Sequence, residues 1–186
     1  KITWQDIQKT LKQGESFVEI VFVNRDNFWF DPPVPEYWAF VIKPGVLEPQ
    51  VIFLGEGTDF EKRQVKYYQN QIQSQLEDML SYNVFWKKIA QATLGQKRIY
   101  LSTDGLYQNL NPLILLNPIT KKFVMDEVEI VRVFTSRDML KKPTDVKLSS
   151  VALIGNPNFT MSRKTGANQH QSKELNFGEV SYSAEG

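Results

Sequence analysis

The order of signals over residues 84–105 constrains the fold more than any other feature. Apolar residues recur at helical spacing over residues 84–94, and Gly95 follows, a residue type that readily ends a helix in the left-handed conformation. A β-rich run at residues 97–102 stops at Thr103-Asp104-Gly105, where the Asp-Gly pair favours a tight turn with positive φ. A helix, a glycine, a strand and a turn in this order are typical of a parallel α/β unit.

The first 54 residues predict a short helix followed by an antiparallel meander. Over residues 3–13 the apolar residues have helical spacing, Thr3 and Asp6 are placed as a capping box, and Gly14 follows as a stop. Three stretches rich in Val, Ile and aromatic residues then follow one another closely, which favours strands joined by short connections. These stretches are residues 17–23, 37–42 and 51–54.

Helical and extended signals continue to residue 154. The longest amphipathic run predicts a helix over residues 58–80, with Thr58 and Glu61 as a capping pair. Further along we expect, in order, a helical turn at residues 111–116 begun by Asn111-Pro112, a hairpin over 117–128 turning near Lys121-Lys122, a strand at 129–134, a capped helical turn at 135–138, and a strand at 151–154 ending at Gly155.

From Asn156 onward the composition changes. Asn, Gln, Ser, Thr, Gly and Lys dominate this segment, so it buries too little apolar surface to offset the entropy lost on ordering. The chain as a whole is 41% hydrophobic and 12% aromatic, enough to build a sizeable core. We expect residues 158–186 to form a long loop or a frayed end.

Charge and residue types narrow the function classes. Lys+Arg 22 against Asp+Glu 21 gives a net charge of +1, so no overall field favours nucleic acid or an anionic membrane. With no Cys and one His, disulfides, thiolate or multi-histidine metal sites and a cysteine nucleophile within this chain are excluded. The opening, with Lys1 in place of Met, shows no apolar signal core, and no stretch approaches the roughly 20 apolar residues of a membrane span. We expect a piece of a longer cytoplasmic protein.

Residues with reactive side chains have simpler structural interpretations. His170 lies in the polar segment, without an apolar frame to hold an imidazole against a nucleophile, and is interpreted as a solvated loop residue. Asp126, Glu127 and Glu129 surround the end of the expected hairpin, where neighbouring side chains diverge, and are interpreted as a solvated turn rather than a catalytic pair. Glycine spacings fit no phosphate loop, dinucleotide-binding pattern or nucleophile elbow.

Four basic doublets also have a simple interpretation. They are scattered among compensating acids, and the aromatic-glycine motif of RNA-binding sheets is missing, so solvated faces explain them better than a nucleic-acid site. The doublets are Lys87-Lys88, Lys97-Arg98, Lys121-Lys122 and Lys141-Lys142.

Ordered motifs over residues 3–159 resemble a known family. Residues 98–116, RIYLSTDGLYQNLNPLILL, combine a strand, an Asp-Gly turn and a short leucine-rich helix. Three further elements follow in order, namely KFVMDE at residues 122–127, FTSRDML at 134–140 and VALIGNPNF at 151–159. Together with TWQDIQ at 3–8 and YWAFVI at 37–42, they are similar to CHAT domains, the caspase-like domains associated with tetratricopeptide repeats.

The resemblance implies an α/β fold: a three-layer α/β/α, caspase-hemoglobinase-like arrangement with a mostly parallel sheet, incomplete in this chain. It also implies a cysteine endopeptidase, in which a His ends one strand, a Cys ends the next, and the imidazole deprotonates the thiol for attack on a peptide carbonyl. Both catalytic residues follow the Gly-Asn-Pro-x-Phe element in that family. The resemblance therefore assigns no catalytic, cofactor-binding or metal-binding residue to this chain, and no cofactor.

These observations lead to one expectation with an alternative. Residues 1–159 are expected to be the amino-terminal portion of a CHAT-like domain, and residues 160–186 a polar loop or disordered tail. The expected partners are the remaining peptidase segment that carries His and Cys, the tetratricopeptide-repeat region of the same bacterial protein and a protein substrate, with no direct contact to nucleic acid and none to a membrane.

The absence of Cys leaves a second interpretation open, a catalytically inactive CHAT-like scaffold or docking module. A nucleic-acid module of another α/β family is disfavoured by the neutral charge balance.

Overall fold

The computed structural model describes residues 2–25 and 33–141, which belong to a compact unit spanning residues 1–144. In chain order its elements are α1 (Trp4–Thr10), β1 (Glu15–Arg25), β2 (Val34–Ile42), β3 (Gln50–Glu56), α2 (Gly57–Asp59), the π-helix η1 (Phe60–Gln64), α3 (Val65–Gln73), the π-helix η2 (Tyr82–Trp86), α4 (Lys87–Ala92), β4 (Arg98–Ser102), the 3-10 helices η3 (Gly105–Gln108) and η4 (Pro112–Ile114), α5 (Val124–Glu127), β5 (Glu129–Arg132) and the 3-10 helix η5 (Ser136–Leu140). The expected strand at 151–154, the boundary between residues 159 and 160, and His170 lie outside these ranges.

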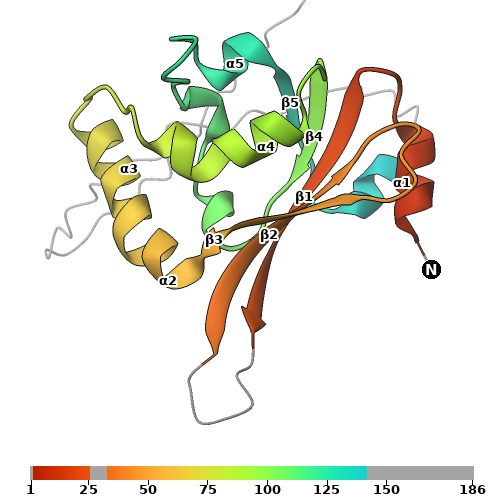
Figure 1. The fold of residues 1–186 in the computed structure, drawn as a ribbon, viewed down its shortest axis with the longest axis horizontal. Coiled ribbons are helices and arrows are strands. Elements are labelled where there is room, and N and C mark those ends of the chain that lie inside the picture. The colour runs from red at the N-terminus through yellow and green to blue at the C-terminus, as the bar shows by residue number, and fades with distance from the viewer. Residues whose placement is uncertain (1, 26–32, 142–186) are drawn as a thin grey trace, which may run out of the picture. The chain divides into compact units, whose positions relative to one another are not determined.

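The strands form one five-stranded sheet in the order β3-β2-β1-β4-β5 (Figure 1). β2 pairs antiparallel with both β1 and β3, which confirms the predicted meander. β4 runs parallel to β1 and to β5, which confirms the parallel α/β unit. The sheet is therefore mixed in the part that the structure describes, with two pairings of each kind, and the expectation of a mostly parallel sheet is not met there. The α/β class holds.

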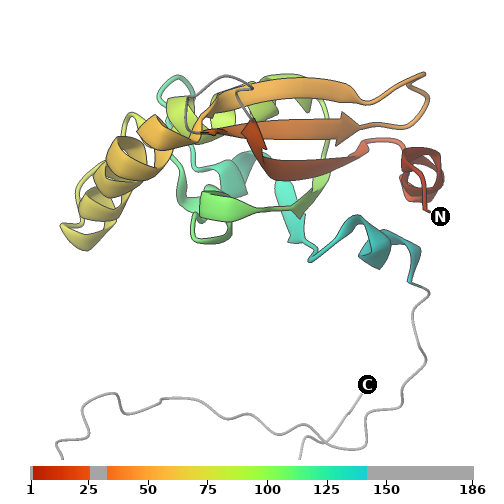
Figure 2. The ribbon, with the colours of Figure 1, turned by 90° about the horizontal axis from the view of Figure 1, so that it is seen from below.

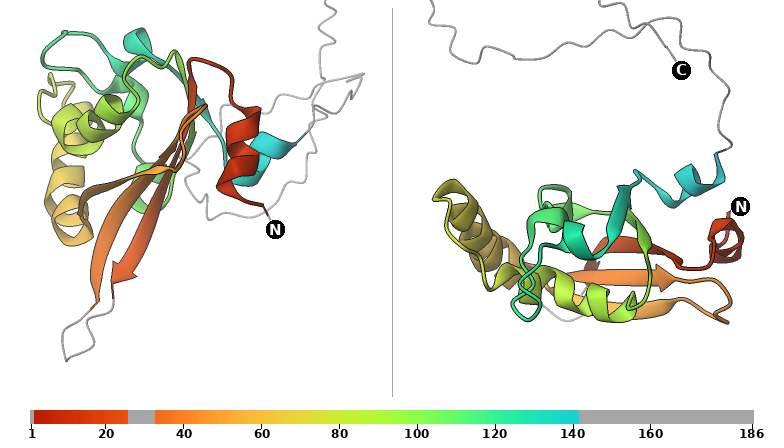
Figure 3. Two further views of the ribbon diagram at one scale, coloured as in Figure 1. Left: turned by 45° about the vertical axis from the view of Figure 1, so that its right-hand side comes forward. Right: turned by 90° about the horizontal axis from the view of Figure 1, so that it is seen from above.

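Helices lie on both faces of the sheet but cover them unequally (Figures 2 and 3). The larger core joins one face to the helices between β3 and β4 and to the segment between β4 and β5, and includes Val18, Tyr37, Phe85 and Leu101. On the other face α1 and η5 pack together over one end of the sheet, around Ile7, Leu11, Phe17 and Ile42. The described residues thus contain a thick and a thin helical layer.

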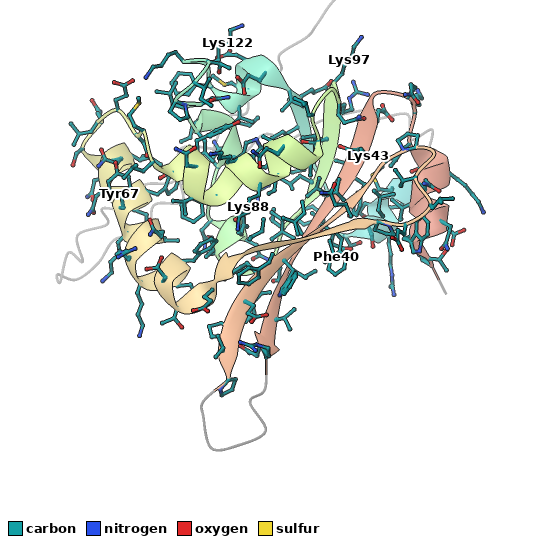
Figure 4. The ribbon with its side chains drawn as sticks, viewed as in Figure 1. Phe40, Lys43, Tyr67, Lys88, Lys97 and Lys122 are labelled. Carbon is teal, nitrogen blue, oxygen red and sulfur yellow. The ribbon has the colours of Figure 1, made fainter. Side chains whose placement is uncertain are left out.

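Beyond α1 and η5 the thin side of the sheet exposes apolar side chains. Alternation along β1 and β2 and the strand register place these side chains on the same face as Phe17 and Ile42. They are Val21, Val23, Trp38, Phe40, Val51 and Phe53, of which Val23, Val51 and Phe53 are 42%, 52% and 38% exposed. Figure 4 labels Phe40 on β2. We call this set the open apolar face.

The two borders of the sheet differ. At β3, Lys88 of α4 donates its ammonium to the carbonyls of Phe53 (2.9 Å) and Leu54 (3.0 Å), so a charged side chain occupies part of that edge (Figure 4). β5 has a strand on one side only within residues 2–25 and 33–141.

The predicted helix at residues 58–80 is wrong at both ends. Helical structure already begins at Gly57, with Glu56 as the N-cap and no side-chain cap, so Thr58 and Glu61 form no capping box. It ends at Gln73, because Gln75 adopts a positive φ of 53°. The Asp78 carboxylate then accepts from the amides of Leu80 and Ser81 and begins the next helical segment, at Tyr82 rather than at residue 84.

The predicted hairpin at residues 117–128 is only partly correct. The chain does turn at Lys121, which has a φ of 58°, and Leu116 and Phe123 form an antiparallel bridge. Residues after that bridge form α5 instead of a strand, because the Asp126 carboxylate accepts from the amide of Phe123 at 3.2 Å. The following strand is also shorter than predicted and ends at Arg132.

The capping box of α1 is confirmed and leads to a prediction on pH dependence. The Asp6 carboxylate accepts from the amide of Thr3 (3.0 Å) and from its hydroxyl (2.9 Å), and these bonds lower the pKa of Asp6 below its ordinary value of 3.8. A carboxyl whose folded pKa is lowered stabilises the fold above its unfolded pKa and loses that effect as the pH falls. Asp6→Asn should therefore be less stable than the wild type at pH 7, and the difference should shrink as the pH falls through 3.8.

Urea unfolding of both proteins across this pH range measures the difference. The matched control is Asp59→Asn, because Asp59 pairs with Arg63 on the surface and is 49% exposed. A difference between Asp6→Asn and wild type that stays constant with pH would contradict the assignment.

Candidate functional site

The carboxyl ends of β4 and β5 lie side by side, since the two parallel strands pair from Arg98 with Glu129 to Leu101 with Arg132. In α/β sheets, ligands commonly bind beyond the carboxyl ends of the strands. The turn that follows β4 and the residues that follow β5 therefore define the candidate site.

The Asp104-Gly105 turn after β4 has the predicted geometry. Gly105 has a φ of +57°, and the Asp104 carboxylate accepts from its amide at 2.7 Å and begins the 3-10 helix η3. The other Asp104 oxygen lies 3.5 Å from the amide of Phe22 on β1. A Cβ on Gly105 would lie 2.5 Å from the Tyr37 hydroxyl oxygen, so only glycine fits this close approach.

The hydroxyl of Tyr37 forms hydrogen bonds that stabilise the turn after β4. Its hydroxyl accepts from the amide of Leu106 (3.1 Å) and donates to the carboxylate of Glu61 (2.8 Å). Burial, reinforced by Glu61, raises the pKa of Tyr37 to about 12. Tyr37, Glu61 and Gly105 line a hollow of about 320 Å³ on one side of η3.

Tyr37→Phe tests this contact. Loss of the hydroxyl leaves the amide of Leu106 without its acceptor, so we expect the free energy of unfolding to fall by about 1–3 kcal/mol. A tyrosine with a raised folded pKa stabilises the fold below its unfolded pKa, and that effect is lost as the pH rises from 10 to about 12. The wild type should therefore lose its advantage over Tyr37→Phe in this range, as measured by urea unfolding at several pH values. A matched Tyr67→Phe variant should stay within about 0.5 kcal/mol of the wild type at pH 7, and an equal loss of stability in the two variants would contradict the contact.

On the other side of η3, Arg132 of β5 lines a second hollow of about 410 Å³. Its Nη2 donates to the hydroxyl of Thr103 (3.1 Å) and to the carbonyls of Tyr107 (3.4 Å) and Gln108 (3.5 Å). Val133 and Phe134 complete the lining, and Phe134 is 95% exposed. We call this hollow the Arg132 hollow.

The carboxylates that the sequence analysis interpreted as a solvated turn do not converge. Asp126 accepts from the amide of Phe123, Glu127 accepts from the side chains of Asn117 and Thr120, and Glu129 pairs with Arg98 at 2.9 Å. Within residues 2–25 and 33–141, no group of three His, Cys, Asp or Glu residues is placed to hold a metal ion. Asp126 and Glu127 bind groups within ten positions of themselves in the chain, and Glu129 joins β5 to β4.

The basic doublets are also dispersed. Lys88 contacts the edge of β3, Arg98 lies between Glu15 (3.3 Å) and Glu129 (2.9 Å), and Lys141 pairs with Asp138 at 2.5 Å. Lys142 lies outside the described residues. Lys88, Arg98 and Lys141 thus each bind a group of the protein itself.

Neither Tyr37 nor Arg132 is indicated as a site residue by the sequence alone. Both lie on strands; Tyr37 opens the YWAFVI run at residues 37–42, where it is read only as part of a strand, and Arg132 belongs to none of the quoted motifs. The signal that could have found Arg132 is its place as the one charged residue in the apolar run from Ile130 to Phe134, at the end of a predicted parallel strand. Tyr37 gives no such signal, because its partners Glu61 and Leu106 are distant in the sequence.

Comparisons with known proteins add no further constraint. Searches with protein-family models, among curated proteins and among solved structures found no significant match. No helix among the described residues is both long and apolar enough to cross a membrane.

Proposed function

We propose that this chain is the amino-terminal portion of a CHAT-type, caspase-like cysteine endopeptidase that hydrolyses peptide bonds in protein substrates. The observation that carries the proposal is the arrangement of β4 and β5. These parallel strands end at one hollowed, polar edge, and the outer side of β5 has no strand beside it within the described residues. A further parallel strand added there would end at the same edge, beside Thr103 and Arg132.

The open apolar face supports the same proposal. Sheets with parallel strands normally have both faces covered, and exposed contiguous apolar surface marks an interaction site. Here α1 and η5 cover only one end of the thin side, while Val51 and Phe53 are 52% and 38% exposed. A second segment of the same domain, supplying more helices, is the simplest cover for this face.

In this proposal the downstream segment, or a second chain produced by processing, supplies the His and Cys of the dyad. The imidazole takes the thiol proton, the thiolate attacks the peptide carbonyl, and the proton passes to the leaving amine as the C–N bond breaks; water then hydrolyses the thioester. The residues of this chain provide the scaffold. Asp104 and Tyr37 fix the turn after β4, and Arg132 presents charge at the edge where the substrate would lie.

A second candidate is a catalytically inactive CHAT-like scaffold or docking module. The observation in its favour is the absence of Cys from all 186 residues. It predicts that the open apolar face is covered by the tetratricopeptide-repeat region or another partner without any peptide cleavage.

The test uses the full natural gene product and a mixture of proteins as substrate. We expect cleavage that stops when the enzyme is first treated with iodoacetamide, whereas the 186-residue chain alone should cleave nothing. Cleavage that survives alkylation, or no cleavage by a gene product that contains a downstream His and Cys, would contradict the peptidase. Binding of the repeat region without cleavage would favour the scaffold.

A further inference from the structure

A carboxylate interrupts the open apolar face of the sheet. Alternation along β1 places the side chain of Glu19 on the same side as Phe17 and Val21. The strand register sets it between Phe40 of β2, labelled in Figure 4, and Ser102 of β4. Phe17 is 1% exposed in the small core beside α1 and η5, whereas Glu19 is only half-buried. Glu19 therefore lies where the covered end of this side of the sheet meets the open part.

The Glu19 carboxylate has no partner among the described residues. Across residues 2–25 and 33–141, no group donates a hydrogen bond to it and no cation pairs with it. The hydroxyl of Ser102, its neighbour on β4, donates instead to the carbonyl of Phe134 (3.3 Å). Burial raises the pKa of Glu19 above its ordinary value of 4.5, whereas a nearby cation would lower it. The charge of Glu19 is thus partly desolvated, and nothing in these ranges compensates it.

Two cations on the same side of the sheet are already paired. Arg98 pairs with Glu15 (3.3 Å) at the start of β1, and Arg25 pairs with Glu36 (2.8 Å) at the end of β1. Each of these acids is compensated by a cation of the same sheet. Glu19 lies between the two pairs on β1 and is left for a cation that the described residues do not supply.

Charge complementarity distinguishes the possible covers of the open apolar face. A buried charge is normally paired, so a cover made only of apolar side chains would bury the Glu19 carboxylate at a high cost. A second copy of this chain would bring the same unpaired carboxylate, while its Arg25 and Arg98 are already used. A cover with a basic residue compensates the charge, and the apolar stem of Lys or Arg can lie along the surrounding apolar surface.

The sheet also indicates the form of the cover. Helices normally cover the faces of sheets that contain parallel strands, and α1 and η5 already do so at one end of this side (Figure 3). The segment from Asn156 to Gly186 is rich in polar residues, so its composition suits an apolar contact poorly. A helix with an apolar side, from another segment, fits the face better.

We propose that the open apolar face is covered by an amphipathic helix, encoded beyond Gly186, which sets one Arg or Lys of its apolar side against the Glu19 carboxylate. The assignment of this helix to the downstream segment rests on the proposed function. The guanidinium or ammonium group donates to Glu19, and apolar residues one helical turn to either side contact Phe40 and Val51. The cover is thus specified by one positive charge within an otherwise apolar contact.

The first test compares Glu19→Gln in two settings, the 186-residue chain and the full natural gene product. In the chain alone, an unpaired amide costs less to bury than an unpaired carboxylate, so the urea midpoint should stay equal or rise. In the full product, the change leaves the buried cation of the helix without its partner, so the midpoint should fall by about 1 M or more. Hydrogen exchange of the peptide that contains β1, followed by mass spectrometry at increasing urea, measures both midpoints.

Glu48→Gln is the matched control, because Glu48 is exposed in the connection between β2 and β3. It should leave both midpoints unchanged. A rise or no change for Glu19→Gln in the full product would overturn the proposal, because the cover would then carry no cation at Glu19. An equal fall in the two settings would also overturn it, because the partner of Glu19 would then lie within the 186 residues.

The second test identifies the helix directly and does not depend on a loss of stability. The photoreactive residue p-benzoylphenylalanine replaces Phe40, which is the register partner of Glu19, in the full gene product, and mass spectrometry maps where it attaches. We expect attachment to a peptide encoded beyond Gly186 and outside the tetratricopeptide repeats, with an Arg or Lys within about one helical turn of the attachment site.

The control for this test places the same photoreactive residue at Leu94, which is 83% exposed after α4 and should not label that peptide. Attachment from position 40 to residues 142–186, to a second copy, to the repeats or to a peptide without a basic residue would overturn the proposal. Absence of any attachment would overturn it as well, because a covered face must lie against its cover.

The cover and the peptidase fail in different ways. If both tests give the expected results but the full gene product cleaves no protein, the paired helix stands and its place in a peptidase falls with the proposed function. If the gene product cleaves protein and alkylation stops it, but Glu19→Gln does not lower the urea midpoint, the peptidase stands and the pairing at Glu19 is wrong.

Discussion

Phe85→Ala should lower the free energy of unfolding by about 3–5 kcal/mol. Phe85 is 1% exposed and lies at the centre of an aromatic cluster, with ring centroids of Phe60, Tyr107 and Tyr68 at 5.5, 6.0 and 6.3 Å. Its removal leaves a cavity beneath the sheet, because η2 and η3 cannot both move into the space. Since a domain is stable by only about 5–15 kcal/mol, this loss should shift chemical unfolding to much lower denaturant.

The control for Phe85→Ala is Leu94→Ala, because the Leu94 side chain is 83% exposed after α4. That variant should stay within about 0.5 kcal/mol of the wild type. Guanidinium unfolding followed by tryptophan fluorescence measures both variants. Similar losses in the two would mean that the core lies elsewhere.

Gly105→Ala should destabilise the fold by about 2–5 kcal/mol, the sum of a left-handed backbone and a steric clash. The φ of +57° disfavours any side chain, and the new Cβ would lie 2.5 Å from the Tyr37 hydroxyl oxygen and 2.8 Å from the Cε1 atom of its ring. Tyr37 cannot withdraw, because it is fully buried and bonded to Leu106 and Glu61. The same urea unfolding experiment measures the loss.

Gly45→Ala separates the two causes. Gly45 also has a positive φ, +75°, but a Cβ there would meet nothing within 4 Å. It should lose only the backbone part, about 1–2 kcal/mol. If Gly105→Ala were no worse than Gly45→Ala, the close packing of Tyr37 against the turn would be wrong, and with it the geometry of the candidate site.

Local sequence rules predicted those elements whose stabilising contacts are local. The capping box of Thr3 and Asp6, the positive φ at Gly105 and the cap of Asn111 on Leu113 depend on residues within three positions of one another, and all are confirmed. The predicted cap at Thr58 is wrong because helical structure begins at Gly57, directly after β3, with Glu56 as the N-cap residue, so Thr58 already lies inside the helix. Gly57 also lies close to Pro35, and a Cβ there would come within 2.8 Å of the proline Cβ.

Residues of the candidate site were less predictable, because long-range contacts create them. Arg132 reaches Thr103, Tyr107 and Gln108 across more than 20 positions, and Tyr37 joins Glu61 to Leu106 across the sheet. Sequence spacing indicated a parallel strand pair but not which side chains would lie at its end. The alternation of apolar residues likewise predicted strands but not that the thin side of the sheet would stay exposed.

The decisive measurement is to find where a peptide-based, thiol-alkylating probe attaches in the full natural gene product, by mass spectrometry of the labelled peptides. If the chain is half of a cysteine peptidase, the probe should modify one cysteine encoded beyond Gly186, and labelling should stop when a downstream histidine is replaced by alanine. Labelling of no cysteine, or of several without dependence on any histidine, would show that these strands support something other than peptide cleavage.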